Sequence, residues 1–157
     1  CLDAVHQLRK ECDGIIVGVE TIIRDDPSLN IRRVPAERQP LRVVIDPNGR
    51  IPQDAKVLTD GEETIVLSDD FSNLPALLNR LGDMEIQRVM VEGGPVTIKH
   101  FLNAGLVDEF YLVHAEVEHQ TPYPSGIDAQ IITDAGLSLN QTITWGDESV
   151  QLFSRLD

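Results

Sequence analysis

The stretch Val89-Met90-Val91-Glu92-Gly93-Gly94-Pro95 constrains the fold most, because an apolar run ends there at a carboxylate, two glycines and a proline. A helical pattern follows over residues 96–104 and stops at Gly105. This predicts a buried strand, a tight turn and a helix whose first turn accepts Pro95, where a missing N–H costs nothing. Glu92 then lies at the carboxyl end of the strand, where open α/β sheets bind ligands.

The glycines of this turn would let a ligand approach the main chain closely, since neither carries a Cβ. The unpaired N–H groups of the first helical turn favour an anion such as phosphate. The pattern is neither GxGxxG nor a P-loop. Taken alone, the stretch agrees equally well with a Gly-rich turn that binds nothing, and both interpretations stay open.

Short apolar runs alternate with helical periodicity along the rest of the chain. We expect strands at 15–19, 41–45, 64–67, 110–115, 143–145 and 150–153, and helices at 2–12 and 74–81. Residues 53–63 are expected to form a loop, with a brief strand around Val57-Leu58. The order predicts an α/β fold with a mostly parallel open sheet, helices on both faces and an antiparallel C-terminal edge. At 157 residues without an internal boundary, one domain spanning 1–157 is expected.

Composition excludes several classes of function. Lys+Arg number 13 against 26 Asp+Glu, so a nucleic-acid-binding surface is not expected and a phosphate site must be local. No apolar run approaches the roughly 20 residues of a membrane span. The cysteines lack metal-ligand spacing and the histidines form no HxxxH pattern, so no metal site is expected. Two cysteines without a signal peptide indicate a reducing compartment, the cytoplasm.

Several polar residues next to the expected strands have two interpretations. Arg9 borders the apolar side of the first helix, where a solvated residue is the simpler explanation. Thr21 follows a strand, and its hydroxyl either caps a short helix or binds a ligand. Of Asp25 and Asp26, one should cap a turn and the other contact a ligand. Arg32 is either a surface residue or a bidentate anion ligand.

Together, several stretches closely resemble the reductase domain of riboflavin biosynthesis, found in the bifunctional deaminase–reductase and in stand-alone diaminopyrimidine reductases. The matching stretches are residues 9–21, 25–29 with Arg32, 42–46 with 50–52, 91–95 and 104–109. The resemblance implies a dihydrofolate-reductase-like fold and a homodimer. It also implies NADPH-dependent reduction of the ribosyl group of 2,5-diamino-6-ribosylamino-4(3H)-pyrimidinone 5′-phosphate, or of its deaminated form, to a ribityl chain.

The same resemblance implies roles for individual residues. Thr21 and Asp25 would contact the nicotinamide cofactor. Arg9, Leu29 and Arg32 would hold the phosphorylated pyrimidine substrate, with the arginines near its phosphate. Glu92 would contact the substrate, either as the general acid or as an orienting group. The residues expected around the cofactor pyrophosphate are Gly93, Gly94, Pro95, Val96 and Thr97.

Departures from the family pattern keep alternatives open. The chain starts after the family's first strand and its Ser-x-Asp-Gly turn, so that strand is expected to be missing or to belong to a longer precursor. Pro47 replaces a small hydroxylated residue, residues 116–126 differ from the usual Gly-rich stretch, and only Arg50 suggests a partner for a 2′-phosphate. The alternatives are a reductase of the same fold acting on a pterin and a truncated, non-catalytic nucleotide-binding or assembly module.

Overall fold

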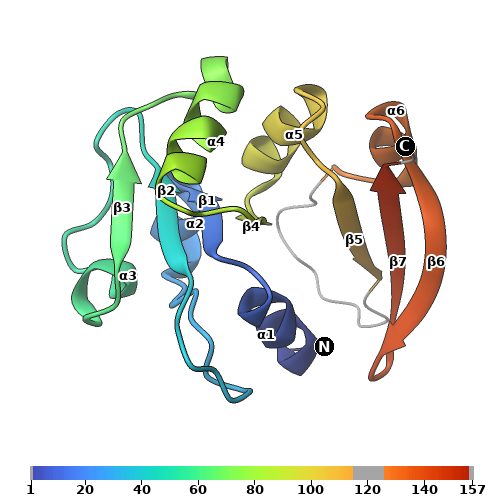
Figure 1. Ribbon diagram of the computed structural model, residues 1–157, viewed down its shortest axis with the longest axis horizontal. Helices are drawn as coiled ribbons and strands as arrows, with labels where there is room; N and C mark the ends of the chain where they lie inside the picture. Colours follow the sequence, from blue (N-terminus) through green and yellow to red (C-terminus); the bar gives the residue numbers. More distant parts are fainter. Residues whose placement is uncertain (1, 115–125, 156–157) are drawn as a thin grey trace. The chain divides into compact units, whose positions relative to one another are not determined.

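The computed structural model describes residues 2–114 and 126–155 (Figure 1). In chain order its elements are α1 (Leu2–Lys10), β1 (Gly14–Gly18), α2 (Val19–Asp25), β2 (Leu41–Ile45), α3 (Lys56–Thr59), β3 (Thr64–Leu67), the 3-10 turn η1 (Phe71–Asn73), α4 (Leu74–Asp83), β4 (Val89–Gly93), α5 (Pro95–Asn103), β5 (Glu109–His114), α6 (Ala129–Asp134), β6 (Leu137–Trp145) and β7 (Glu148–Arg155). The chain divides into two compact units, Leu2–Ile98 and Lys99–Asp157. The expectation of one domain over the whole chain stays a prediction.

A four-stranded parallel sheet in the order β3-β2-β1-β4 forms the centre of the unit Leu2–Ile98. β1 pairs with β2 on one side and with β4 on the other. The register with β4 shifts between Ile16 and Val17, which brings Val17 opposite Gly93. The carboxyl ends of β1 and β4 are therefore neighbours, although Gly18 and Gly93 are 75 positions apart in the sequence.

Both faces of this sheet are covered. Successive strand residues point to opposite faces, yet Ile15, Ile16 and Val17 are all 0% exposed. Ile15 and Val17 belong to one hydrophobic cluster with Ile22 of α2. Ile16 must therefore point to the opposite face, and Figure 1 draws α4 in front of the sheet and α2 behind it. The predicted parallel sheet with two covered faces is confirmed.

The unit Lys99–Asp157 contains a three-stranded antiparallel sheet in the order β5-β7-β6. A turn at Gly146, with φ of 63°, joins β6 to β7, as the sequence predicts. Both closing strands are longer than expected, and their partners in the described residues are one another and β5. The antiparallel part of the fold is therefore a sheet of its own rather than an edge added to the parallel strands.

Helix boundaries follow their local signals in most places. Asn73 accepts a hydrogen bond from the Ala76 N–H at 3.2 Å and caps α4. α5 begins at Pro95, and Gly105 follows its end with φ of 69°. α4 continues through Gly82 to Asp83, two residues beyond the expected end at 81.

Two short helices differ from the sequence prediction. The strand considered around Val57 is wrong, because residues 56–59 form one helical turn in which the Leu58 N–H donates to the Ala55 carbonyl at 2.9 Å. Val57 is fully buried in this turn. A strand would bury it as well, so the apolar pair Val57-Leu58 could not distinguish a strand from a helical turn. The sequence reading also missed α6, which Asp128 caps by accepting from the Ile131 N–H at 3.0 Å.

Candidate functional site

The neighbouring carboxyl ends of β1 and β4 form a topological switch point. From β1 the chain crosses to β2 on one side, whereas β4 lies on the other side of β1 and leads away from the sheet through α5. Open α/β sheets bind ligands in the crevice at such a point, because no connection covers it. Every residue that the sequence assigned to a cofactor or substrate site lies within the unit Leu2–Ile98, which contains this edge.

Thr21 lies over the Gly93-Gly94 turn. A Cβ built on Gly93 would lie 3.1 Å from Thr21 Oγ1, and one built on Gly94 would lie 3.3 Å from the same atom. Both distances are shorter than an ordinary contact. Glycine is therefore favoured at these positions because the Thr21 side chain packs closely against them, and not because the backbone conformation requires it. Thr21 does not cap α2, because the N-cap is Gly18 and has no side-chain bond. Its hydroxyl is thus placed at the turn, as the ligand-binding interpretation requires.

A second close approach joins β1 to α5. A Cβ on Gly18 would lie only 2.4 Å from Thr97 Oγ1, and Thr97 is 4% exposed. The Thr97 side chain therefore packs against Gly18 in the interior. Only the Thr97 main chain could contribute to an anion site. Val96, in contrast, is 65% exposed.

The turn before α5 offers main-chain donors. The Ile98 N–H donates to the Gly94 carbonyl at 3.1 Å and closes the first turn of the helix. The N–H groups that precede Ile98 have no partner within the helix, and Pro95 has no N–H to leave unpaired. Asp25 lies one helical turn after Thr21 on α2 and is exposed.

Arg9 and Glu92 form an ion pair in the same unit. Arg9 Nε donates to Glu92 Oε1 at 2.8 Å, and the two side chains are only 12% and 8% exposed. The interpretation of Arg9 as a solvated helix residue is therefore wrong. Arg9 Nη1 also donates to the Asn30 carbonyl at 2.9 Å. Glu92 Oε2 is buried and has no hydrogen-bond partner among residues 2–114 and 126–155, so the carboxylate keeps an acceptor that a bound ligand would satisfy.

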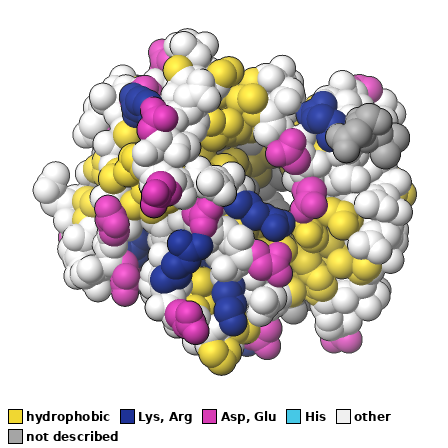
Figure 2. Space-filling view, in the orientation of Figure 1, with side chains coloured by type: hydrophobic (Ala, Val, Ile, Leu, Met, Phe, Trp, Pro, Cys, Tyr) yellow, Lys and Arg dark blue, Asp and Glu magenta, His cyan; other side chains and the backbone are white. Residues whose placement is uncertain are grey.

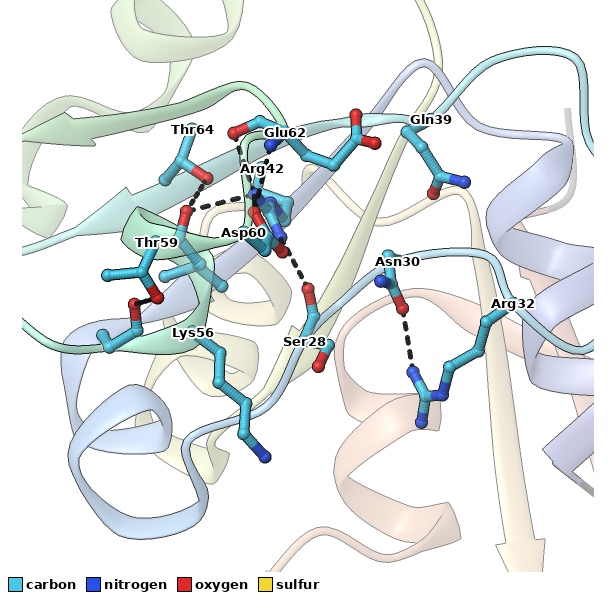
Figure 3. A network of polar contacts seen from close by, with 12 residues as sticks. Ser28, Asn30, Arg32, Gln39, Arg42, Lys56, Thr59, Asp60, Glu62 and Thr64 are labelled. Atoms are coloured by element: carbon cyan, nitrogen blue, oxygen red, sulfur yellow. Dashed lines mark hydrogen bonds and ion pairs between the residues drawn. The ribbon is translucent and has the colours of Figure 1, made fainter.

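Leu29 and Arg32 lie on the segment 26–32, which is neither helix nor strand. The Leu29 side chain belongs to the hydrophobic core, is 3% exposed and has φ of 52°, so a ligand would meet its main chain. Arg32 is exposed, and its Nη1 donates to Asn30 Oδ1 at 2.9 Å (Figure 3). The segment forms no strand, and main-chain groups of Ile31 and Arg32 bond to side chains instead.

Side chains from other elements hold that segment. Arg42 is 1% exposed and donates to the Ser28 carbonyl at 2.8 Å and, through two nitrogens, to both carboxylate oxygens of Asp60 at 2.6 and 2.7 Å (Figure 3). Gln39 bonds both the N–H and the carbonyl of Ile31, at 2.7 and 2.9 Å. These contacts fix a loop that has no regular structure of its own.

Three residues of this framework were not recognised from the sequence: His6, Gln39 and Arg42. Arg42 carried a signal, because an arginine inside the apolar strand 41–45 is buried only when it is paired. Its guanidinium holds the pKa of Asp60 below the usual range, chiefly through their hydrogen bonds. His6 and Gln39 carried no such signal, since both are common at exposed positions.

Local charge around the site is mixed. On the face drawn in Figure 2, acidic and basic side chains are interspersed with hydrophobic ones. Arg50 pairs with Glu20, and both oxygens of Asp46 accept main-chain N–H groups, from Arg50 and Ile51 at 2.9 Å each. A 2′-phosphate would therefore have to compete with Glu20 for the Arg50 guanidinium.

Two further findings bear on the site. Over residues 2–114 and 126–155, no group of three His, Cys, Asp or Glu side chains is arranged to hold a metal, and no helix is long and apolar enough to cross a bilayer. The remodelled stretch expected at 116–126 lies outside the described residues except for Gly126.

Comparison with known proteins gives a consistent result. Residues 2–117 match the family model described as the RibD C-terminal domain. The chain is 39% identical over 123 residues to the riboflavin biosynthesis protein RibD of Aquifex aeolicus, covering 66% of this chain and 35% of that protein. It is 36% identical over 132 residues to the 2,5-diamino-6-ribosylamino-4(3H)-pyrimidinone 5′-phosphate reductase of Methanothermobacter thermautotrophicus, covering 69% of this chain and 61% of that protein.

Solved structures share the fold. A deaminase/reductase from Thermotoga maritima superimposes with a TM-score of 0.78 at 19% identity, covering 98% of this chain and 48% of that one. The riboflavin biosynthesis reductase Rib7 of Saccharomyces cerevisiae gives 0.73 at 18% identity, covering 98% of this chain and 80% of that one. The expected fold class is confirmed. The chain spans about a third to two thirds of the length of the two curated relatives described above.

Proposed function

Because the chain belongs to the RibD C-terminal domain family, we propose that it is the reductase part of a riboflavin biosynthesis enzyme. The proposed reaction is the NADPH-dependent reduction of the ribosyl group of 2,5-diamino-6-ribosylamino-4(3H)-pyrimidinone 5′-phosphate, or of its deaminated form, to a ribityl group. The relative from Methanothermobacter thermautotrophicus carries the name of this activity. We further propose that the chain acts as a homodimer in the cytoplasm.

The buried Arg9–Glu92 pair carries this proposal. One Glu92 oxygen is held by Arg9, and the other is buried without a donor in the part of the chain that the structure describes. Glu92 lies on the strand that leads into the Gly93-Gly94 turn. A buried carboxylate oxygen without a donor is costly unless a ligand hydroxyl or N–H satisfies it. A sugar hydroxyl or a pyrimidine N–H of the substrate would supply that donor.

The glycine turn is the part of the site that we propose to bind the pyrophosphate of a dinucleotide. The Thr21 hydroxyl already lies against Gly93 and Gly94, so the pyrophosphate would meet the main-chain N–H groups of the turn and of the first turn of α5, which begins there. Thr21 and Asp25 would hold the nicotinamide end. The groups proposed around the pyrophosphate are the main chain of Gly93, Gly94, Pro95, Val96 and Thr97.

Bound NADPH would supply a hydride to C1′ of the open-chain imine form of the substrate. The protein's part is positioning, because effective hydride transfer requires the donor and acceptor carbons to be held together. Arg9 and Arg32 would bind the substrate phosphate, Leu29 would contact the substrate through its main chain, and Glu92 would orient the sugar or donate a proton.

Two matched variants test the assignment in the full-length protein, by titrating NADPH fluorescence and measuring turnover. Gly94→Val places a branched side chain against the pyrophosphate and should abolish NADPH binding at micromolar concentrations. Arg32→Ala should raise the KM for the substrate and leave NADPH affinity unchanged, with Arg38→Ala as a control for loss of an exposed arginine. Absence of NADPH binding to the unmodified protein at millimolar concentration would refute the proposal, and turnover of a dihydropterin in place of the pyrimidine would redirect it.

A further inference from the structure

A buried histidine connects the two arginines proposed to bind the substrate phosphate. His6 is 2% exposed and is the buried residue of α1. Its Nδ1 lies 3.1 Å from the main-chain nitrogen of Arg32, and its Nε2 lies 3.4 Å from Arg9 Nη1. One imidazole thus touches both the segment that carries Arg32 and the side chain of Arg9.

The geometry fixes the protonation state of this ring. A main-chain N–H can only donate, so Nδ1 must present its lone pair to Arg32. In the neutral ring the proton is then on Nε2, where it faces an Arg9 N–H, so the 3.4 Å approach to Arg9 is a contact between two donors rather than a hydrogen bond. A second proton, on Nδ1, would break the bond to the Arg32 N–H. The structure therefore requires a neutral His6.

The charged groups around His6 favour the same state. Burial is the main cause that lowers the pKa of His6, followed by the nearby cations Arg9 on the same helix and Arg32 and Arg33 on the facing segment. Asp3, also on α1, opposes them weakly, and it is paired with Arg33 at 2.5 Å. The ring is thus neutral at physiological pH.

Position 32 depends on His6 because the rest of its segment is already fixed. Gln39 holds both polar main-chain groups of Ile31, and Arg9 holds the carbonyl of Asn30. The His6 bond to the next N–H along the chain sets where the Arg32 Cα lies. From there, Figure 3 shows the Arg32 side chain extending to Asn30.

We propose that His6 is a positioning residue that sets the Arg32 main chain in the arrangement that binds an anionic substrate group. This inference rests on the proposed function, in which Arg9 and Arg32 bind a phosphate monoester. His6 itself does not touch the substrate. Its loss should weaken the affinity for the phosphorylated substrate and leave the NADPH site, built from α2, β4 and α5, unchanged.

A pair of variants separates the effect of the His6 hydrogen bond from the effect of the His6 side-chain volume. His6→Leu has a similar volume but no acceptor, and His6→Asn presents an amide oxygen on the Nδ1 side and cannot titrate. Loss of one hydrogen bond at a charged site corresponds to about a tenfold change in affinity. We expect His6→Leu to raise the substrate KM about tenfold with unchanged kcat and NADPH affinity, and His6→Asn to restore most of the loss. Gln7→Leu, an exposed neighbour on α1, controls for helix changes and should have no effect.

The pH profile provides a second measurement. In the unmodified enzyme, substrate affinity should fall in acid as His6 gains a proton, with a midpoint below the ordinary histidine pKa. His6→Asn should lack that loss, while the titration of the substrate phosphate remains common to both proteins. An unchanged acid limb in His6→Asn overturns the inference even if His6→Leu fails to fold, as does a folded His6→Leu with unchanged KM. Lack of turnover by the unmodified enzyme would instead overturn the proposed function.

Discussion

Gly18→Ala tests whether the ends of β1 and α5 are packed as closely as the structure indicates. Gly18 has φ of −79° and ψ of 154°, a conformation open to any residue, so alanine brings no backbone strain. Its Cβ would, however, lie 2.4 Å from Thr97 Oγ1. Thr97 is β-branched, lies in a helix and is 4% exposed, so its hydroxyl has little freedom to move away.

Overpacking of this kind costs about 1–3 kcal/mol. For a chain of this size, each kcal/mol shifts the melting temperature by about 2–4 °C, so Gly18→Ala should melt roughly 2–12 °C lower in a calorimetric scan. NADPH affinity should fall as well, because the displaced residue belongs to the first turn of α5.

Two controls isolate the steric cause. Gly82→Ala adds the same methyl group inside α4, where nothing lies within 4 Å, and should stabilise the protein by about 0.4–1 kcal/mol. In the double variant Gly18→Ala/Thr97→Ala the clash disappears, so the two effects should be less than additive by more than about 0.5 kcal/mol. An unchanged melting temperature for Gly18→Ala, or strict additivity, would refute the reasoning.

Two further substitutions probe the framework around the segment 26–32. The Arg42 hydrogen bonds hold the pKa of Asp60 below its usual value of about 3.9, so the pair stabilises the fold above that pH and the stabilisation is lost as pH falls through the lower folded pKa. Asp60→Asn should therefore unfold at lower urea concentration at pH 7 and show a weaker acid dependence below about pH 5; an unchanged slope would contradict this. Gln39→Ala removes both bonds to Ile31, so hydrogen exchange at the Ile31 amide should accelerate about tenfold while exchange at Val43 in β2 stays unchanged. Equal acceleration at both amides would indicate global destabilisation instead.

Much of the fold could be predicted because its signals are local. The fully buried strand around Ile16 is an uninterrupted apolar run, and Pro95 and Asn73 mark helix starts by chemistry that acts over a few residues. Short elements were predicted less well. A single helical turn at Val57 has no measurable period, and its assignment depends on bonds that form only after packing.

The site shows the same division. Glu92 and Thr21 could be located, since Glu92 lies at the carboxyl end of one strand and Thr21 just beyond the end of another, at the edge where parallel sheets bind ligands. The partnership of Arg9 with Glu92 could not be read from periodicity, because it joins residues 83 positions apart. His6 and Gln39 act on main-chain atoms of a distant loop, and such contacts leave no pattern in the residues that make them. The roles assigned to individual site residues stay predictions.

The segment 26–32 is held mainly by its main chain: the bonds from Arg42, Arg9, Gln39 and His6 end on the atoms of residues 28, 30, 31 and 32 that every amino acid shares. The main-chain conformation of the segment is therefore determined largely by residues outside it. Substitution of the Ser28 or Asn30 side chain should therefore leave the main-chain conformation of the segment unchanged. The side chains that face a ligand could then vary among proteins of this fold while the loop keeps its conformation.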